Sequence, residues 1–135
     1  MRYLLDTDIC IYIIKRKPER VLARLLRTSR GDVGISAITL SELQYGVERS
    51  DRREQNRMAL GAFIAPLEVL PYDRSVADHY GKIRAQLDMV GKPVGALDLL
   101  IAAHALTCGL VLVTNNEREF RRVPSLKVEN WAVET

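Results

Sequence analysis

Four acidic residues that are far apart in the sequence stand beside its apolar segments: Asp6, Glu42, Asp98 and Glu119. Carboxylates that lie together repel one another, so such a group is costly unless a cation neutralises it. Oxygen ligands without His or Cys favour a hard ion, Mg²⁺ or Mn²⁺. Water activated by such an ion can attack a phosphodiester. The first question is therefore whether the fold brings the four side chains together.

Apolar segments typical of strands alternate along the chain with segments typical of helices. We expect strands at residues 2–6, 31–36, 67–72, 110–114 and 126–131. We expect helices at residues 9–16, 18–27, 38–46, 51–65, 75–90 and 98–108, and a polar loop or short helix at 115–125. Apolar strands separated by helices indicate a parallel sheet covered on both faces. The sequence predicts one three-layer α/β/α domain over residues 1–135, with a central, mostly parallel sheet.

The predicted sheet places all four acids at the same edge. Asp6 ends the first strand, and Glu119 follows the strand at 110–114. Glu42 lies early in the helix after the second strand, and Asp98 opens the apolar helix after the loop GKPVG. In sheets of this kind, ligands bind at the carboxyl ends of the strands. The four acids are therefore candidate metal ligands and catalytic residues.

Each acid also has an ordinary structural explanation. Asp6 or Asp8 could cap the first helix. Glu42, three residues after Thr39, fits a capping box. Asp98 at a helix start is favoured by the helix dipole, and the fourth acid could simply be solvated. The coincidence of four acids at one edge favours the metal site over these separate explanations.

A second feature is a run of basic residues early in the chain, within a net charge of +3. Arg16, Arg20, Arg24 and Arg27 recur at helical spacing and are expected to share one face. Such a stripe is either a solvated helix face or a surface that binds the phosphates of a nucleic acid. The two interpretations are about equally well supported, and a nearby nuclease site would favour the second.

The remaining bulk features indicate a cytoplasmic protein. The longest apolar run, ALDLLIAAHAL, is too short and too polar to span a membrane, and no signal peptide is expected. Cys10 and Cys108 both stand in apolar surroundings and are predicted to be buried free thiols. His104, on the apolar helix, is predicted to be a core residue and not a ligand.

Four segments, LLDTDICIYIIKRKP, ISAITLSELQYGVERS, KPVGALDLLIAAHAL and LVTNNEREFRRVPSLKVENW, resemble the PIN-domain ribonuclease toxins of the VapC family. They follow in the family's order over almost the whole chain. The resemblance implies a compact α/β/α domain and a Mg²⁺- or Mn²⁺-dependent endoribonuclease that cuts RNA, with transfer RNA as one candidate. It also implies a VapB-type antitoxin that neutralises the toxin, and a homodimer.

The resemblance assigns roles residue by residue. The family's acidic residues correspond to Asp6, Glu42, Asp98 and Glu119. The polar residues that support them correspond to Thr7, Thr114 and Asn116. Two positions depart from the family pattern: Asp8 stands where Asn is more usual, and Leu97 where a small polar residue is common. Asp8 either adds negative charge near the metal or caps the first helix.

Two alternatives remain open at the level of sequence. The motif DTD after a first strand is also found in HAD-type phosphatases, but Cys10 stands where those enzymes have Thr or Val, and no later pair of adjacent acids exists. The second alternative is an inactive PIN-like module that binds RNA or a partner. All four acids are present, which argues against it.

The antitoxin would need apolar surface, and the first two helices offer more apolar side chains than one core stripe requires. They are Ile13, Ile14, Val21, Leu22, Leu25 and Leu26. The alternative is that all six lie in the core, which is favoured for Val21 and Leu25. An arginine of the antitoxin could also form bidentate bonds with the acids themselves.

Overall fold

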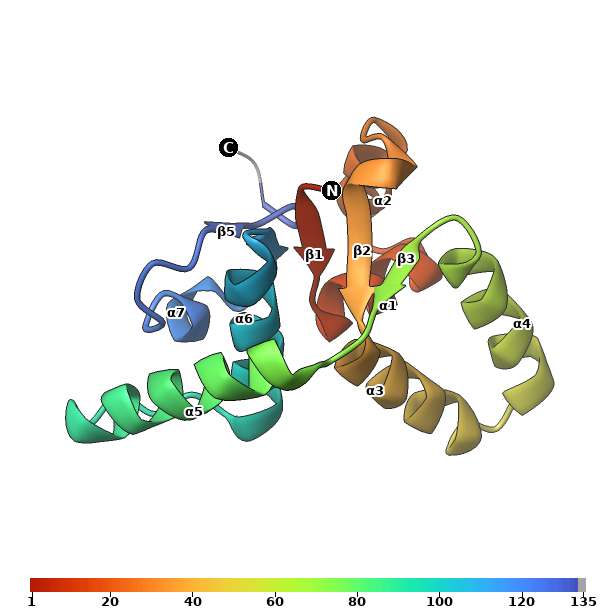
Figure 1. Cartoon of the computed structure of the whole chain (residues 1–135). Helices are drawn as coiled ribbons and strands as arrows, with labels where there is room; N and C mark the ends of the chain where they lie inside the picture. The colour runs from red at the N-terminus through yellow and green to blue at the C-terminus, as the bar shows by residue number, and fades with distance from the viewer. Residues whose placement is uncertain (134–135) are drawn as a thin grey trace.

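A five-stranded parallel sheet forms the centre of the computed structural model, which describes residues 1–133 (Figure 1). The strands are β1 (Tyr3–Leu5), β2 (Val33–Ser36), β3 (Glu68–Leu70), β4 (Val111–Val113) and β5 (Val128–Glu129). Their order in the sheet is β3-β2-β1-β4-β5, and every neighbouring pair is parallel. The predicted α/β fold is confirmed, with a sheet that is parallel throughout.

Helices cover both faces of this sheet. They are α1 (Thr7–Lys15), α2 (Glu19–Leu26), α3 (Ala37–Glu48), α4 (Arg53–Ile64), α5 (Arg74–Met89), α6 (Ala96–Cys108) and α7 (Glu117–Phe120), with a 3-10 turn η1 at Arg30–Asp32. In Figure 1, α4 lies to the right of β3 and α3 lies below β2 and β3, whereas α5, α6 and α7 lie below the left part of the sheet. Within residues 1–133, none of these helices combines the length and the apolar character that crossing a bilayer requires.

The short strand β1, at the centre of the sheet, is apolar at every position. Tyr3 and Leu5 pack into a core with residues of α1 to α4, whereas Leu4 packs into a second core with residues of α5, α6 and α7. Successive side chains of a strand point to opposite faces. Because both faces are covered, every position of β1 is apolar and buried.

Several local expectations need correction. Pro18 is the N-cap of α2, which begins at Glu19, and does not lie inside the helix. The N-cap of α3 is Ser36, so Thr39 and Glu42 do not form a capping box. Cys108 is exposed, unlike the buried Cys10, because it is the last residue of α6.

The carboxyl ends of the central strands meet at one edge. Leu5 of β1 is in register with Ile35 of β2 and with Val113 of β4. The Asp6 N–H, one residue beyond β1, donates to the Val113 carbonyl at 3.0 Å. This edge therefore collects the residues that follow β1, β2 and β4.

Candidate active site at the carboxyl edge of the sheet

Asp6 lies at the centre of this edge, where β1 turns into α1. Its Oδ1 accepts from the Ile9 N–H at 2.9 Å and caps α1, and the Thr114 hydroxyl also binds its carboxylate. Burial raises the pKa of Asp6 to about 6; the hydrogen bonds from Thr114 and Ile9 oppose this rise, and the charges of Asp8 and Glu42 add to it. The expected cap is thus real, but the buried carboxylate lies in a cluster of acids.

Glu42 reaches this edge from the second turn of α3. Its Oε1 accepts a hydrogen bond from the Thr7 hydroxyl at 2.7 Å, which joins the start of α1 to α3. Thr39, one turn before Glu42, is buried beside the same hydroxyl, with its Oγ1 3.4 Å from that of Thr7. Thr7 therefore positions Glu42, as its predicted supporting role requires.

Asp98 and Glu119 form a hydrogen-bonded pair on the other side of the edge. Burial, the hydrogen bond with Glu119 and its negative charge raise the pKa of Asp98 to about 7, with smaller contributions from Asp6 and Glu42. The contact with Glu119 therefore favours the protonated form of Asp98. Two carboxylates in contact behave in this way when no cation separates them.

Glu119 is held in place by a backbone amide and by Asn116. The Gly95 N–H donates to Glu119 Oε1 at 2.6 Å, and Asn116 Nδ2 donates to Oε2 at 2.6 Å. Burial favours a higher pKa for Glu119, but bonds from Gly95, Asp98 and Asn116, with the positive charge of Arg122, outweigh it and lower the pKa. Glu119 is therefore the ionised partner of the pair.

The structure brings all four predicted acids within electrostatic reach, which defines the acid site as Asp6, Glu42, Asp98 and Glu119. Asp98 is repelled by each of the other three. Each carboxylate also has a protein partner, and within residues 1–133 no three acidic, histidine or cysteine side chains are already arranged as a set of metal ligands. The donor set consists of oxygen alone. Burial, followed by the charges of neighbouring acids, raises the pKa of Asp6 and Asp98, and a hard divalent cation would offset both effects. The residues therefore fit Mg²⁺ or Mn²⁺.

The supporting residues differ in how closely they belong to the acid site. Thr114 is fully buried and its Oγ1 also accepts from the Asn116 N–H at 3.0 Å, so it links Asp6 to the loop that carries Glu119. Asp8 lies in the first turn of α1 with an exposed side chain, and it is not the cap of that helix. Leu97 is half exposed.

Gly95 is the residue of this site that the sequence interpretation missed. It is the N-cap of α6, and its backbone N–H donates a hydrogen bond to Glu119. The signal was present, because glycine is accepted at an N-cap and here precedes Asp98 by three residues. His104 is a core histidine as predicted, with its Nδ1 2.7 Å from the Ser36 hydroxyl oxygen.

The predicted arginine stripe is not a single helix face. Arg16 adopts a left-handed conformation that ends α1, whereas Arg20 and Arg24 lie in α2 and Arg27 follows it. Arg24 forms an ion pair with Glu129 at 2.8 Å and lies over the ring of Trp131. The prediction of one shared face is therefore wrong for Arg16, because the break at Lys17 and Pro18 separates α1 from α2. The other three arginines keep their helical spacing along α2.

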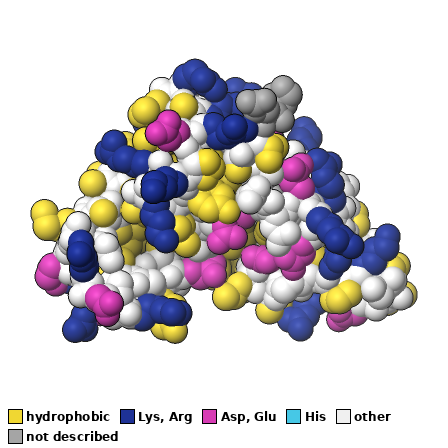
Figure 2. Space-filling view, turned by 180° about the vertical axis from the view of Figure 1, so that it is seen from behind, with side chains coloured by type: hydrophobic (Ala, Val, Ile, Leu, Met, Phe, Trp, Pro, Cys, Tyr) yellow, Lys and Arg dark blue, Asp and Glu magenta, His cyan; other side chains and the backbone are white. Residues whose placement is uncertain are grey.

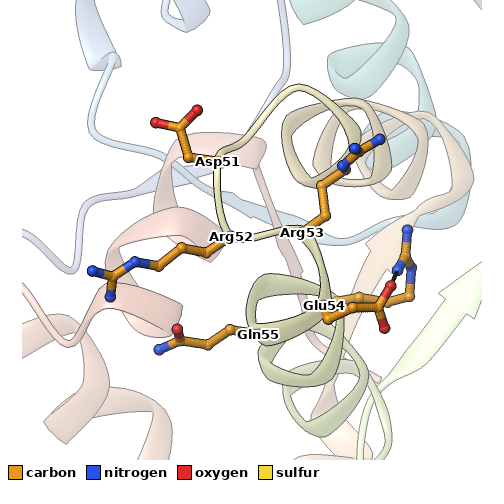
Figure 3. A pocket seen from close by; sticks show the side chains of 6 residues that line it. Asp51, Arg52, Arg53, Glu54 and Gln55 are labelled. Atoms are coloured by element: carbon orange, nitrogen blue, oxygen red, sulfur yellow. Dashed lines mark hydrogen bonds and ion pairs between the residues drawn. The ribbon is translucent and has the colours of Figure 1, made fainter.

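Another hollow lies at the turn between α3 and α4, away from the acid site. It is lined by Asp51, Arg52, Arg53, Glu54, Gln55 and Arg57. The labelled side chains in Figure 3 point in different directions and do not converge on a common point. Arg57 is already paired with Glu48 and Glu54. This hollow has no arrangement suited to a reaction.

Comparison with known proteins agrees with the fold. The PIN domain family matches residues 3–126. A "tRNA(fMet)-specific endonuclease VapC" of Salmonella typhimurium is 50% identical over 97% of this chain and 98% of that protein. A protein of the same name from Shigella flexneri is 46% identical over 98% of this chain and 99% of its own length. The crystal structure of DNA-bound VapBC from Salmonella typhimurium matches with a TM-score of 0.92 and 47% identity, covering 97% of this chain and 98% of that chain.

Fold and acid site together define a PIN-domain nuclease. The chain belongs to the VapC family of ribonucleases, the toxins of VapBC toxin–antitoxin systems. As a member of this family it is an RNA phosphodiester hydrolase. The phosphatase and the inactive module are therefore set aside.

Proposed function

We propose that this endoribonuclease cleaves transfer RNA, with initiator tRNA as its first candidate substrate, at the acid site and with Mg²⁺ or Mn²⁺. The observation that carries the proposal is the hydrogen bond between Asp98 and Glu119 beside the buried Asp6, at the carboxyl edge of the sheet. The names of two relatives with nearly complete coverage supply the candidate substrate. We propose further that residues 1–135 form a single PIN domain.

The residues of the chain have distinct parts in this proposal. Asp6, Glu42, Asp98 and Glu119 would hold the ion. When bound, that ion supplies the positive charge that offsets the carboxylates and activates a water molecule. Thr7 orients Glu42, and Asn116 orients Glu119, through the bonds already described. Thr114 ties Asp6 to the same loop.

Cleavage of purified tRNA(fMet), with Mg²⁺ and with EDTA, tests this function. Asp98→Asn should abolish cleavage, because it removes one carboxylate without changing the size of the side chain. Asp88→Asn is the matched control, since this substitution makes the same chemical change at an exposed position of α5. Undiminished cleavage in EDTA, or by Asp98→Asn, would contradict the metal-dependent acid site.

We propose that a VapB-type antitoxin neutralises the protein in the cytoplasm and that the toxin forms a homodimer. The solved relative is a VapBC complex. Of the six apolar residues expected to serve docking, Ile13, Val21 and Leu25 are buried, and Leu26 is exposed. A hollow of about 340 Å³ between α1, α3 and α4 adds apolar surface from Ile11, Ile14, Leu43, Val47 and Leu60. We also propose that an antitoxin arginine reaches the acid site and pairs with its carboxylates.

Expression in a cell tests the partnership. The chain alone should arrest growth, and either Asp6→Ala or co-expression with the cognate antitoxin should restore it. Purification of the pair on a sizing column gives the stoichiometry and shows whether the toxin is dimeric. Normal growth with the well-expressed wild-type chain alone would contradict the toxin role.

A further inference from the structure

A basic hollow lies next to the acid site, on the side of Glu119. It has a volume of about 570 Å³ and is lined by Gly91, Lys92, Pro93, Arg118, Arg121 and Arg122. All four charged residues of the lining are cations. In Figure 2 the acidic side chains gather near the middle of the face, and groups of Lys and Arg lie on both sides of them. Cations and acids therefore divide this surface into neighbouring regions of opposite sign.

Two contacts join the basic hollow to the acid site. Arg122 Nη1 donates to the Pro93 carbonyl at 2.8 Å, and its charge also attracts Glu119. The Gly95 N–H, two residues beyond Pro93, donates to Glu119 Oε1 at 2.6 Å. The loop at residues 91–95 is thus the wall of the hollow at one end and a support of the acid site at the other.

Two of the four cations of the hollow are uncompensated. Arg121 forms an ion pair with Glu117 at 2.7 Å, and Arg122 uses one of its five donors on Pro93. In the part of the chain that the structure describes, the side chains of Lys92 and Arg118 form no hydrogen bond or ion pair with another residue. Like charges that converge without partners disfavour one another and attract a polyanion.

We propose that the basic hollow binds the phosphodiester backbone of the RNA substrate immediately beside the bond that is cut. This inference rests on the proposed function, since it names where the substrate of the same site is held. A substrate that reaches Glu119 must pass over adjoining surface, and this surface offers phosphate contacts. An acidic protein segment could pair with the same cations, but it would bring no phosphodiester to the acid site beside them.

The basic hollow is a better candidate for phosphate binding than the predicted arginine stripe. Arg24 is held by Glu129 and Trp131, so its guanidinium is already engaged. Lys92 lies in the loop at 91–95, whose Gly95 binds Glu119, and Arg118 lies in α7 next to Glu119. Their charges are therefore beside the acid site. Phosphate contacts made there position the substrate without reading its bases.

RNA binding by an uncleaving protein tests the proposal. In an Asp98→Asn background, fluorescently labelled tRNA(fMet) and a scrambled RNA of the same length are titrated at several salt concentrations. The variant is the pair Lys92→Glu and Arg118→Glu. The matched control is Arg52→Glu and Arg53→Glu, which makes the same change of charge at the exposed turn shown in Figure 3.

The Lys92/Arg118 pair should weaken binding of both RNAs by about tenfold or more and lower the salt slope by about 1–2, whereas the control pair should change both much less. Equal losses for the two pairs would mean that only net charge matters, and unchanged binding would remove the hollow from the substrate path. Loss of antitoxin binding with normal RNA binding would assign it to an acidic protein segment. Each of these results overturns the proposal.

Two controls keep the result interpretable. The substituted residues are exposed, so thermal melting should match the background protein, and the milder pair Lys92→Gln and Arg118→Gln should give an intermediate loss. Cleavage of tRNA(fMet) by the wild type with Mg²⁺ is measured separately. Its absence would overturn the proposed function, whereas its presence with unchanged binding by the variant overturns only the basic hollow.

Discussion

The Nδ1 atom of His104 lies 2.7 Å from the hydroxyl oxygen of Ser36, deep between α6 and the start of α3. Both residues are almost fully buried, and the Ser36 hydroxyl also accepts from the Ile38 N–H as the cap of α3. Helix α6 carries Asp98, and helix α3 carries Glu42. This one bond therefore joins the supports of two acids behind the acid site.

Ser36→Ala should lower the free energy of unfolding by about 1–3 kcal/mol, because it removes a cap and leaves the buried Nδ1 atom of His104 without its partner. Ser41→Ala is the matched control, since that hydroxyl is exposed and bonds only to the Ala37 carbonyl. It should change stability by less than about 0.5 kcal/mol. Denaturant unfolding measures both, and equal effects would contradict a structural role for the pair.

The stability of the metal-free protein should fall as the pH rises from 5 to 8. The pKa of Asp6 is about 6 and that of Asp98 about 7 in the folded state, whereas both ionise near their ordinary value of 3.8 when the chain unfolds. In this window the folded protein binds more protons than the unfolded chain, so raising the pH destabilises it. For Asp6 the shift corresponds to about 3 kcal/mol.

Thermal melts at pH 5, 6.5 and 8 measure this dependence, with and without Mg²⁺. The ion should stabilise the protein most at pH 8, where the carboxylates are ionised. Asp6→Asn should flatten the difference between the lowest and highest pH relative to the wild type. An equal pH dependence in the wild type and in Asp6→Asn would show that Asp6 is not the titrating group.

Gly34→Ala should destabilise the sheet. A Cβ atom at this position would lie 2.9 Å from the Met1 sulfur and 3.0 Å from the Glu68 carbonyl oxygen of β3. The methionine can move, but the backbone of a neighbouring strand cannot do so without cost, so a loss of about 1–3 kcal/mol is expected. Gly61→Ala, in α4 with open space around it, should instead gain up to about 1 kcal/mol. Unfolding curves that give both changes the same sign would contradict this account.

Cleavage should leave 5′-phosphate and 3′-hydroxyl ends. The alternative products, 2′,3′-cyclic phosphates, require a base that takes the proton of a ribose 2′-hydroxyl. Neither histidine is placed for this, because His104 is buried against Ser36 and His79 of α5 is bonded to Thr107 near the end of α6. Labelling of the product ends with and without phosphatase distinguishes the two outcomes, and cyclic ends would show that the nucleophile is not water.

The sequence predicted the parts of this protein that depend on local patterns. Apolar strands that alternate with helices along the sequence indicate a parallel sheet. Since ligands bind at the carboxyl ends of such strands, Asp6, Glu42 and Asp98 could be predicted to lie at one edge. The predicted arginine stripe is wrong for Arg16, because the regular spacing was extended across Lys17 and Pro18, where α1 has ended and α2 has not yet begun. The prediction that Cys108 is buried is wrong, because the exposure of a residue at a helix end depends on which segments pack against that end.

Other features depend on contacts between distant segments. The bond from Gly95 to Glu119 joins residues that are far apart in the sequence, and no periodicity marks it. The same holds for Thr7 with Glu42, whose side chains meet only when α1 and α3 pack together. The basic hollow is also assembled from two segments, the loop at 91–95 and the residues around α7.

The four acids come from four separate elements, the first after β1 and the last in α7. Chains are synthesised from the amino end at about 5–20 residues per second, so several seconds separate the making of Asp6 from that of Glu119. On the proposed function, a nascent chain carries an incomplete set of acids throughout this time. The ribosome can thus produce an enzyme that attacks the RNA of translation, and that enzyme becomes active only after the segment that carries Glu119 has been made.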